Sequence, residues 1–334
     1  MRRIDTRRLT ISPDEHLCVA CVRNEALRLP YFLEYHRRLG IDRFLIVDNA
    51  SEDGTLAIVR RFDVTVTESK RNTGFSKAHN VLIRESQSEY VLVLNPDAIL
   101  RPTFIEEIVR ALDARQDAGS ASGKLLRMDN MTIDSTGIVM LPNQRHLDRG
   151  ADQPDAGQFD KAEDIFGASG AAAVYRRSAL VDAQIEGECF DENFFAYRED
   201  ADLAWRLQLL GWKSIYVPAA VAQHRRRVTP ERRASLSKVI NCHSVKNRFL
   251  LRINNMSGSL YARHFWRITA RDLLVIGYVL LREWSSIPAL FFVLGNFSRL
   301  WRRRRVVQSK VRASSTDIER WFTIPARERH KPSG

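Results

Sequence analysis

The chain of 334 residues has few cysteines and no long apolar run. Four cysteines do not make a disulfide scaffold, and reduced thiols are typical of the cytoplasm. Cys18 and Cys21 have C-x-x-C spacing, but they lie in an apolar segment of buried-strand type. Residues three apart on a strand face opposite sides, and no second cysteine pair completes a zinc site, so we favour a structural role for both.

No segment is predicted to cross a membrane. The longest apolar stretches, residues 273–281 and 287–296, are each too short to span a bilayer, and charged residues separate them. The first three residues are basic, but no apolar core of sufficient length follows, so no signal peptide is predicted. These features indicate a cytoplasmic protein.

Positive charge is concentrated in the last third of the chain. Residues 225–334 contain 24 Lys and Arg against 6 Asp and Glu, whereas the first 224 residues contain 28 against 34. The apolar fraction of 44% indicates a folded protein. A basic tail on a mildly acidic body predicts docking to an anionic surface.

Short apolar runs alternate with helical patterns over residues 16–130, which predicts a parallel sheet. The predicted strands are 16–22, 43–47, 63–67, 90–94 and 119–126, and the predicted helices between them are 27–39, 54–62, 74–87 and 102–115. The later pattern predicts a hairpin near 133–140, a small-residue strand at 167–175, a helix at 199–210, strands at 213–217 and 221–224, and basic amphipathic helices from 229.

Acidic residues follow two of the predicted strands and open a later helix. Asp48 follows the strand at 43–47, Asp97 follows the strand at 90–94, and Glu199, Asp200 and Asp202 open the helix at 199–210. Ligands bind at the carboxyl ends of strands in open parallel sheets. Two carboxylates there suit a nucleotide and a divalent metal, and the third group could supply a base. The pattern predicts chemistry on a nucleotide-linked substrate.

In this order the motifs resemble family 2 glycosyltransferases, especially the bacterial rhamnosyltransferase-like branch. The resemblance covers about residues 15–225 and rests on 23–25, 47–55, 72–80, 95–97 and 194–212. It implies an α/β GT-A fold, with a Rossmann-like, mostly parallel sheet flanked by helices, here followed by a C-terminal basic helical extension. It also implies inverting transfer of a sugar from a nucleotide-diphosphate donor.

The resemblance divides the chain into four parts. We expect an N-terminal arm at residues 1–14, a nucleotide-sugar-binding half at 15–127, an acceptor and catalytic half at 128–228, and the basic extension at 229–334.

Three donor-binding candidates follow the first two strands. Asn24 and Glu25 would face the nucleotide, and the carboxylate that matches Asp48 accepts hydrogen bonds from the base or ribose in the family. The alternative is that Asp48 only caps a turn.

Four further donor-binding candidates are Asn72, Gly74, Lys77 and Asn80. They belong to a segment that opens a helix, where free backbone N–H groups could face a diphosphate. Lys77 and Asn80 are three residues apart and can share a helix face, although Lys77 could equally be an ordinary surface residue.

Asn95-Pro96-Asp97 occupies the position of the family's D-x-D motif, whose carboxylates hold a metal. Asn95 removes one charged ligand and is kept as a donor contact, and Asp97 remains the preferred ligand because hard divalent ions prefer oxygen donors. In relatives a His at the place of His224 joins the metal shell, although a lone His near a strand end is often structural. The resemblance implies Mg²⁺ or Mn²⁺.

The acids at 199–202 match the family's motif for the catalytic base. Asp200 matches the base position best, and Glu199 or Asp202 could orient it or bind the acceptor. The alternative is a solvated helix N-terminus, where acids are favourable in any case.

Aromatic residues and arginines alternate in the tail. They are Tyr261, Phe265, Trp266, Trp284, Phe291, Phe292 and Trp301, followed by Arg302–Arg305. Such helices suit an anionic membrane surface, and the alternative is a helical lid on the catalytic domain. Nucleic acid ranks third because no nucleic-acid motif accompanies the charge.

The sequence as a whole predicts a peripheral enzyme on the inner face of the cell membrane. It would move rhamnose or another hexose from its nucleotide diphosphate to a glycan or polyprenyl-linked acceptor in cell-wall or surface-polysaccharide synthesis. The alternatives are a sugar-phosphate nucleotidyltransferase and an inactive scaffold that binds nucleotide-sugar or lipid.

Overall fold

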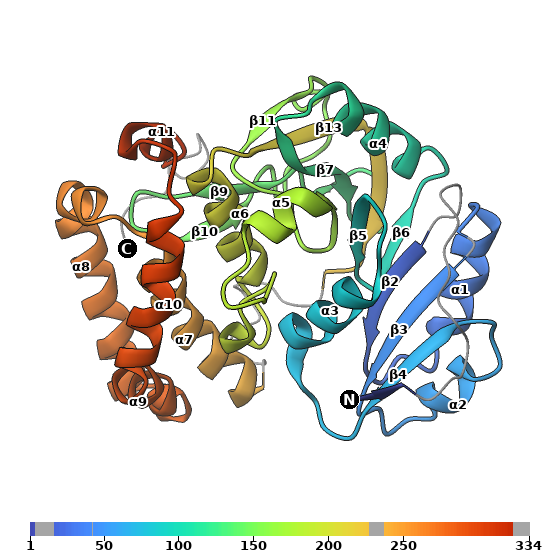
Figure 1. Ribbon diagram of the computed structural model, residues 1–334, viewed down its shortest axis with the longest axis horizontal. Helices are drawn as coiled ribbons and strands as arrows, with labels where there is room; N and C mark the ends of the chain where they lie inside the picture. Colours follow the sequence, from blue (N-terminus) through green and yellow to red (C-terminus); the bar gives the residue numbers. More distant parts are fainter. Residues whose placement is uncertain (4–16, 42, 227–236, 323–334) are drawn as a thin grey trace.

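The computed structural model describes the whole chain except residues 4–16, 42, 227–236 and 323–334. Most of the predicted N-terminal arm and the predicted boundary at residue 229 therefore lie outside the described residues. The chain forms one large mixed sheet with helices on both faces and a group of helices beside it (Figure 1).

The sheet is built from strands in the order β1-β4-β3-β2-β5-β12-β7-β13-β11. Strands β2 to β5 are parallel, β12 is antiparallel to both of its neighbours, and β13 runs parallel to β7. The bounds are β1 Arg2–Arg3, β2 Leu17–Val22, β3 Arg43–Asn49, β4 Thr65–Ser69, β5 Tyr90–Leu94, β6 Ala98–Leu100, β7 Ala118–Leu126, β8 Ile133–Ser135, β9 Ile138–Met140, β10 His146–Asp148, β11 Glu163–Ile165, β12 Ala172–Arg176 and β13 Lys213–His224.

Two apolar clusters cover the two faces of the sheet. One joins the sheet to α1 Leu29–Arg38 and α4 Phe104–Ala114, and Leu29, Phe104 and Ile108 in it are fully buried. The other joins the sheet to α3 Gly74–Glu85, α5 Arg177–Asp182 and α6 Glu199–Leu209. The short helix α2 Thr55–Val59 packs beside α1. Each predicted strand and helix before residue 127 is present, so the α/β fold class is confirmed.

The predicted hairpin near residues 133–140 is wrong. Strand β8 pairs with β7 and β9 pairs with β10, so the two strands turn to different partners. The predicted strands at 213–217 and 221–224 form one strand, β13, with an irregularity between Val217 and Val221. This strand carries His224 to the same edge of the sheet as Asp97, because β13 pairs with β6 immediately after the Asp97 turn.

A group of helices follows the sheet. These are α7 Lys238–Asn255, α8 Gly258–Leu281, η3 Trp284–Ser286, α9 Ile287–Gly295, α10 Phe297–Ser309 and α11 Ser315–Glu319. Helices α7, α10 and α11 pack with α6 through a third apolar cluster that includes Trp205, Leu251 and Leu300. Helix α8 lies at the outer side of this group (Figure 1).

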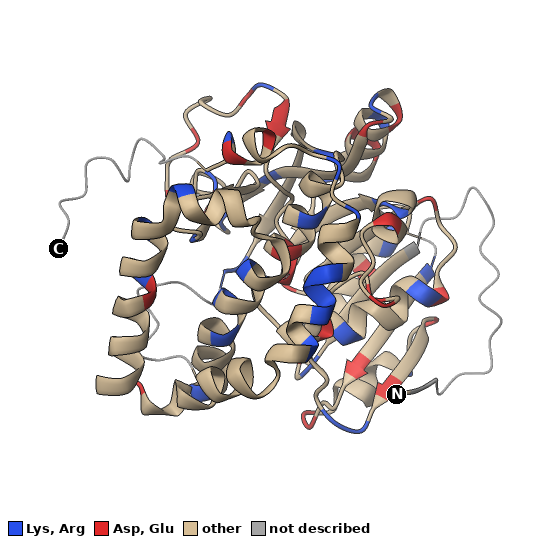
Figure 2. Ribbon diagram, turned by 60° about the vertical axis from the view of Figure 1, so that its left-hand side comes forward, with Lys and Arg blue, Asp and Glu red and all other residues tan. Residues whose placement is uncertain are grey.

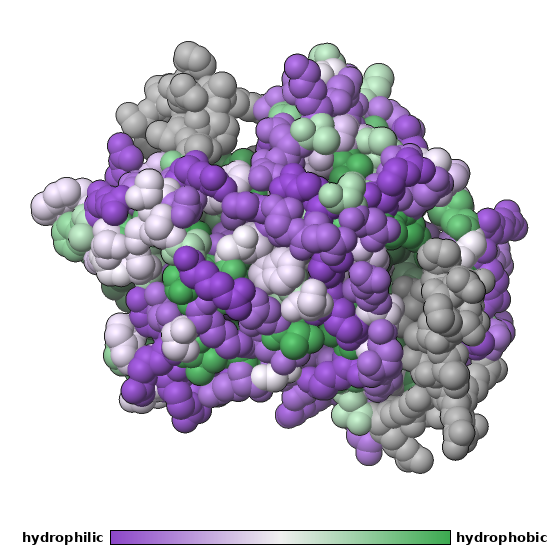
Figure 3. Space-filling model, turned by 45° about the horizontal axis from the view of Figure 1, so that its top comes forward, coloured by the Kyte–Doolittle hydropathy of each residue, from purple (hydrophilic) through white to green (hydrophobic). Residues whose placement is uncertain are grey.

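Charge and hydropathy differ within this group. Lys and Arg are dense on α10, whereas α9 carries none (Figure 2). Of the run Arg302–Arg305, Arg303 is only 4% exposed and Arg304 donates to the carbonyl of Ile253, so the run does not form one solvated stripe. The molecular face brought forward in Figure 3 is mostly hydrophilic.

Candidate active site

The loops after β2 and β3 are held together by hydrogen bonds. The N–H of Asn24 donates to Ser51 Oγ at 3.0 Å, and Asn24 Oδ1 accepts from the N–H of Glu52 at 2.9 Å. The N–H of Glu25 donates to Thr55 Oγ1 at 2.8 Å, and its carboxylate accepts from Arg28 Nε at 2.7 Å. Burial raises the pKa of Glu25, and the nearby Asp97 adds to this increase.

Asp48 lies at the end of β3 and is 2% exposed. One carboxylate oxygen accepts from the N–H of Ser51 at 3.3 Å, and the other, Oδ1, has no hydrogen-bond partner among the described residues. A buried carboxylate oxygen without a partner is costly unless a ligand supplies the missing donor. The hydrogen bond from Ser51 matches a turn cap, and the unpartnered oxygen leaves Asp48 able to accept a hydrogen bond from a ligand as well.

Three N–H groups at the start of α3 that were expected to be free have partners within the protein. The N–H groups of Thr73, Gly74 and Ser76 donate to Asn49, Asn72 and the carbonyl of Phe195, respectively. Gly74 has φ +82°, and a Cβ there would lie 2.4 Å from the Phe195 oxygen. Gly74 therefore packs the start of α3 against the segment that precedes α6, whereas Asn72 ties it to Asn49 at the end of β3. The N–H groups of Thr73, Gly74 and Ser76 have no capacity left for a diphosphate.

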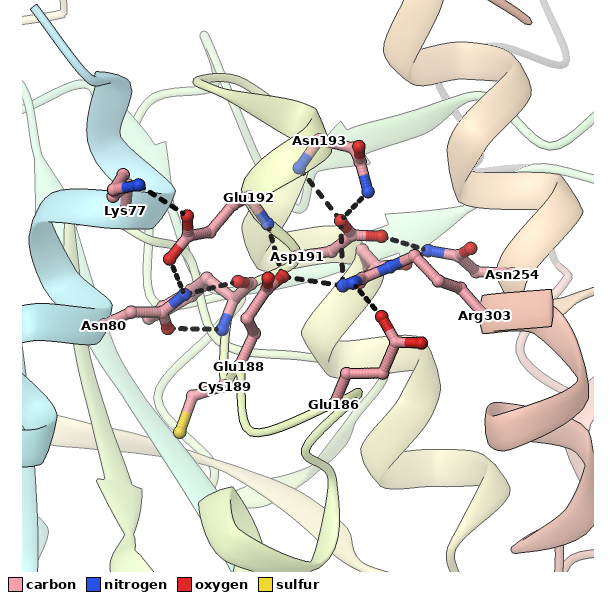
Figure 4. Close-up of polar contacts among 12 residues, drawn as sticks. Lys77, Asn80, Glu186, Glu188, Cys189, Asp191, Glu192, Asn193, Asn254 and Arg303 are labelled. Atoms are coloured by element: carbon pink, nitrogen blue, oxygen red, sulfur yellow. Dashed lines mark hydrogen bonds and ion pairs between the residues drawn. The ribbon is translucent and has the colours of Figure 1, made fainter. Parts of the chain in front are cut away.

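Lys77 and Asn80 share a helix face, as predicted, but this face contacts protein (Figure 4). Lys77 Nζ lies 3.4 Å from Glu192 Oε2. Asn80 is 1% exposed, and its amide donates to the carbonyl of Phe190 and accepts from the N–H of the same residue. The assignment of Asn80 to donor binding is therefore replaced by a structural role.

Asp97 and His224 meet at the strand ends. His224 Nε2 lies 3.5 Å from Asp97 Oδ1, and its Nδ1 lies 2.8 Å from Asp134 Oδ2. Burial alone would lower the pKa of His224, but the hydrogen bonds with Asp134 and Asp97 outweigh it and raise this pKa to about 9. Asn95 lies at the same turn, and its N–H donates to the carbonyl of Ala171.

Three charged residues of this site are not among the predicted site residues. Arg226 donates to Asp134 at 2.8 Å and forms an ion pair of 2.7 Å with Asp148. Asp148 in turn raises the pKa of Asp200, so the charges reach from the strand ends to the start of α6. Asp134 and Asp148 lie in the segment 128–165, which has no periodic pattern, and the buried position of Asp134 becomes visible only in the folded chain.

Asp200 is partly exposed and is held by two backbone N–H groups. Its Oδ2 accepts from Gly170 at 3.1 Å, and its Oδ1 accepts from Ala201 at 2.7 Å. Burial raises the pKa of Asp200, and these hydrogen bonds oppose the increase. The two hydrogen bonds thus fix the orientation of the carboxylate.

Glu199 and Asp202 have different surroundings. Burial and the charge of Asp200 raise the pKa of Glu199 to about 8, so this group is largely protonated at neutral pH. Asp202 is 0% exposed, and its oxygens accept from Arg206, Asn254 and Asn255. Asp202 joins α6 to α7 and has no free side, which removes it from the set of catalytic candidates.

The residues present fit part of a divalent metal site. Asp97 and His224 offer one oxygen and one nitrogen ligand, and Asp134 supplies the second carboxylate that usually orients a metal-binding imidazole. No three His, Cys, Asp or Glu side chains converge on one point within the described parts of the chain. Water or substrate oxygens would complete the coordination of such an ion.

This combination of fold and side chains defines a class of enzyme. A mostly parallel sheet with carboxylates at its strand ends, facing a helix that opens with acids, is the architecture of GT-A glycosyltransferases. Residues 18–182 of the chain match the model of glycosyl transferase family 2. The predicted resemblance to this family is confirmed.

The relatives and similar structures agree with this class. The chain is 32% identical over 214 residues to the N-acetylglucosaminyl-diphospho-decaprenol L-rhamnosyltransferase of Mycobacterium tuberculosis. This alignment covers 54% of the chain and 66% of the relative, so the chain spans slightly less than two thirds of the relative's length. GalNAc-T7 with UDP, GalNAc and Mn²⁺ has a TM-score of 0.62 at 12% identity and covers 91% of this chain and 56% of that protein. Staphylococcus aureus TarS with UDP-GlcNAc has a TM-score of 0.54 at 15% identity, and the match covers 92% of this chain and 89% of that protein. These two likenesses concern the fold.

Proposed function

We propose that the chain is an inverting glycosyltransferase that moves rhamnose or another hexose from a nucleotide-diphosphate donor to a glycan or lipid-linked glycan. The observation that carries the proposal is the Asp200 carboxylate, fixed by Gly170 and Ala201 at the start of α6 and electrostatically coupled to the group at the strand ends. Asp200 would take the proton of an acceptor hydroxyl. The acceptor oxygen would attack the anomeric carbon as the bond to the nucleoside diphosphate breaks.

The donor would bind at the carboxyl ends of β2, β3 and β5. Asp48 offers an unpartnered oxygen to the base or ribose, and Asn24, Glu25 and Asn95 surround the same edge. Asp97 and His224 would hold Mg²⁺ or Mn²⁺, which neutralises the charge of a leaving diphosphate when bound. In support, the similar GalNAc-T7 structure contains Mn²⁺ and UDP.

We propose a polyprenyl-linked acceptor in cell-wall or surface-polysaccharide synthesis. The support is the name of the mycobacterial relative, which describes a diphospho-decaprenol substrate. An acceptor of this kind lies in a membrane, so the enzyme would work at the inner face of the cell membrane.

We propose that the protein contacts the membrane at the turn between α8 and α9. Within the described parts of the chain, no single helix has both the length and the apolar composition to cross a bilayer, and α8 passes only jointly with residues 284–295, which are bent away from it by 113°. The turn exposes large apolar side chains that we call the apolar tip, and they are Leu280, Leu281, Trp284, Phe291 and Leu294, each at least 50% exposed. A tip of this kind with arginines near it suits the interface of an anionic membrane.

A transfer assay tests the proposal. Purified protein is incubated with a panel of nucleotide sugars and a polyprenyl-diphosphate N-acetylglucosamine acceptor, and products are identified by mass spectrometry. Asp200→Asn should lower kcat by about 10²-fold or more, because a positioned base contributes about 10²–10⁴-fold. Donor affinity by calorimetry should be nearly unchanged in this variant.

Two companion variants sharpen the assay. Asp97→Ala should weaken donor binding and remove any response to Mn²⁺ or EDTA. Glu106→Gln, at a carboxylate that is 66% exposed on α4, serves as the control and should behave like the natural protein. Full turnover by the Asp200 variant would remove Asp200 from the role of base.

A further inference from the structure

The segment immediately before Asp200 has an unfavourable backbone. Phe195, Tyr197 and Arg198 have φ of +66°, +71° and +71°, in the left-handed region that residues with a Cβ seldom adopt. Each such residue costs roughly 1–2 kcal/mol. Three within four positions require strong contacts from the surrounding structure, because the relaxed backbone would otherwise point the start of α6 elsewhere.

Those contacts come from α7, outside the part of the chain that the family model matches. Asn247 is 0% exposed, and its side-chain amide donates to the carbonyl oxygens of Phe194, Ala196 and Tyr197 at 2.9, 2.8 and 2.7 Å. An amide group has only two N–H bonds, so at least one is shared between carbonyls. The Oδ1 atom of Asn247 has no hydrogen-bond partner among the described residues.

A second residue of α7 supports the same segment. His243, one helical turn before Asn247, stacks on Phe195 with ring centroids 4.5 Å apart and planes 6° apart. The segment is thus held by a ring contact at its start and by hydrogen bonds along its length. Its end is Arg198, whose carbonyl accepts from the N–H of Asp202 in the first turn of α6.

The position of Asp200 leaves little tolerance for movement. A Cβ on Gly170 would lie 3.2 Å from the Asp200 Cβ, so the two residues are already in close contact. The Asp200 carboxylate keeps its bond to the Gly170 N–H only while α6 begins at its present place. Displacement of a reacting group by about 1 Å can cost about 10²-fold in rate.

We propose that Asn247 is a positioning residue for catalysis, which holds the left-handed segment so that Asp200 faces the acceptor hydroxyl. This inference rests on the proposed function. It makes α7 part of the catalytic unit, although this helix belongs to the basic extension. Asn247 acts through the backbone of residues 194–197 and does not contact substrate.

The test compares two buried asparagines of the same helix. Asn247→Leu keeps the volume and removes the donors, and Asn247→Gln restores an amide. The control is Asn241→Leu, because Asn241 is also buried on α7, at 7% exposed, but takes no part in the hydrogen bonds described above that hold residues 194–197 and the start of α6. We expect Asn247→Leu to lower kcat by about 10–100-fold with donor KM unchanged, Asn247→Gln to recover part of it, and the control to keep kcat within about threefold.

Hydrogen exchange gives a second readout that needs no enzyme assay. The backbone N–H groups of residues 194–200 should exchange faster in Asn247→Leu than in the control, at a temperature where both variants are folded. Unchanged exchange, equal loss of kcat in both leucine variants, or a loss of donor affinity in Asn247→Leu would overturn the inference. Absence of sugar transfer by the natural protein would instead refute the proposed function, and exchange would still decide whether Asn247 holds the segment.

Discussion

Helices α7 and α8 follow one another in the chain, separated only by Met256 and Ser257, but their surroundings are opposite. Helix α7 places polar side chains inside the protein, and its buried members include Asn241, Lys246, Asn247, Arg248, Asn254 and Asn255. Helix α8 turns large apolar side chains outward, and Trp266, Leu273, Leu274, Tyr278, Leu280 and Leu281 are each at least 49% exposed.

The difference shows what each helix contacts. The polar groups of α7 find carbonyl and carboxylate partners in the catalytic half, which is what burial of polar groups requires. The apolar groups of α8 face outward, as in a helix that meets another apolar phase. We therefore propose that the membrane-binding unit begins with α8, later than the boundary expected at residue 229, and that α10 and α11, which pack with α6 and α7, belong to the catalytic unit.

The largest effect should follow from ending the chain after Met256. This truncation would remove the apolar tip, but it would also remove Leu300, Val307 and Ile318, which are nearly fully buried in a cluster with α6 and α7. Truncating one such buried side chain to Ala typically costs about 2–5 kcal/mol, against a total stability of about 5–15 kcal/mol. We expect loss of cooperative thermal unfolding, measured by circular dichroism. A melting temperature within about 5 °C of the natural protein would show that α10 and α11 are dispensable.

Two neighbouring arginines on α10 allow a matched comparison. Arg303 is 4% exposed and binds Glu186, Glu188 and Asp191 (Figure 4), whereas the Arg302 side chain is 61% exposed. Arg303→Met would leave the buried Asp191 carboxylate without this partner and should cost about 3–5 kcal/mol. Arg302→Met should change stability by about 0.5 kcal/mol or less. Urea denaturation measures both, and equal values would contradict the inward role of Arg303.

Local patterns predicted the first half of the molecule well. Strands β2, β3 and β5 are continuous apolar runs, and an apolar run with a polar residue at its end is visible in the sequence without knowledge of its neighbours. Asp48 and Asp97 were placed correctly at the sheet edge for this reason. The antiparallel insertion of β12 between β5 and β7 could not be predicted, because pairing depends on contacts between distant segments.

Contacts between distant segments also explain why the roles predicted for Asn80 and Asp202 were wrong. Asn80 and Asp202 belong to motifs of the right residue types, but hydrogen bonds to Phe190 and to α7 occupy their side chains. Those partners are separated from them by 110 and about 50 residues, so no local pattern shows them. Asp134 was missed for the opposite reason, because its sequence neighbourhood has no motif and its partners His224 and Arg226 arrive from β13 and beyond.

A pH series tests the inward face of α7. Lys246 is 6% exposed, and burial lowers its pKa to about 8, with a contribution from Arg299. An unfolded Lys has a pKa of about 10.4, so between pH 8 and 10 the unfolded chain binds more protons and stability should rise with pH. Below pH 8 the full cost of burying the ammonium group is present. Lys246→Met should therefore stabilise the protein by about 1–3 kcal/mol at pH 7 and by less at pH 10.

Lys238→Met is the control for this series, because Lys238 is exposed on the same helix. Its effect on the free energy of unfolding should be small and independent of pH over the same range. A Lys246 variant with no gain at pH 7 would show that the cation–π contact with Phe292, at 4.9 Å, outweighs the cost of burial.

The smallest expected effect concerns the outward face of α8. Leu281→Ser removes one side chain of the apolar tip, and Leu27→Ser on the donor half is the control, with the two leucines 76% and 88% exposed. Full burial of a leucine side chain is worth about 1.5–3 kcal/mol, so loss of a partly inserted Leu281 side chain should weaken vesicle binding by about tenfold. Vesicle co-sedimentation should show no change for the Leu27 variant.

Salt separates the two contributions to this binding. The electrostatic screening length falls from about 10 Å at 0.1 M salt to about 3 Å at 1 M, so attraction between the arginines and anionic lipids should fade over this range. The difference between the Leu281 variant and the natural protein should persist at 1 M, because insertion of an apolar side chain does not depend on screening. Equal pelleting of both proteins at every salt concentration would leave α8 as a helical lid with no lipid contact. Preferential binding of duplex DNA over vesicles would instead favour nucleic acid as the partner of the basic extension.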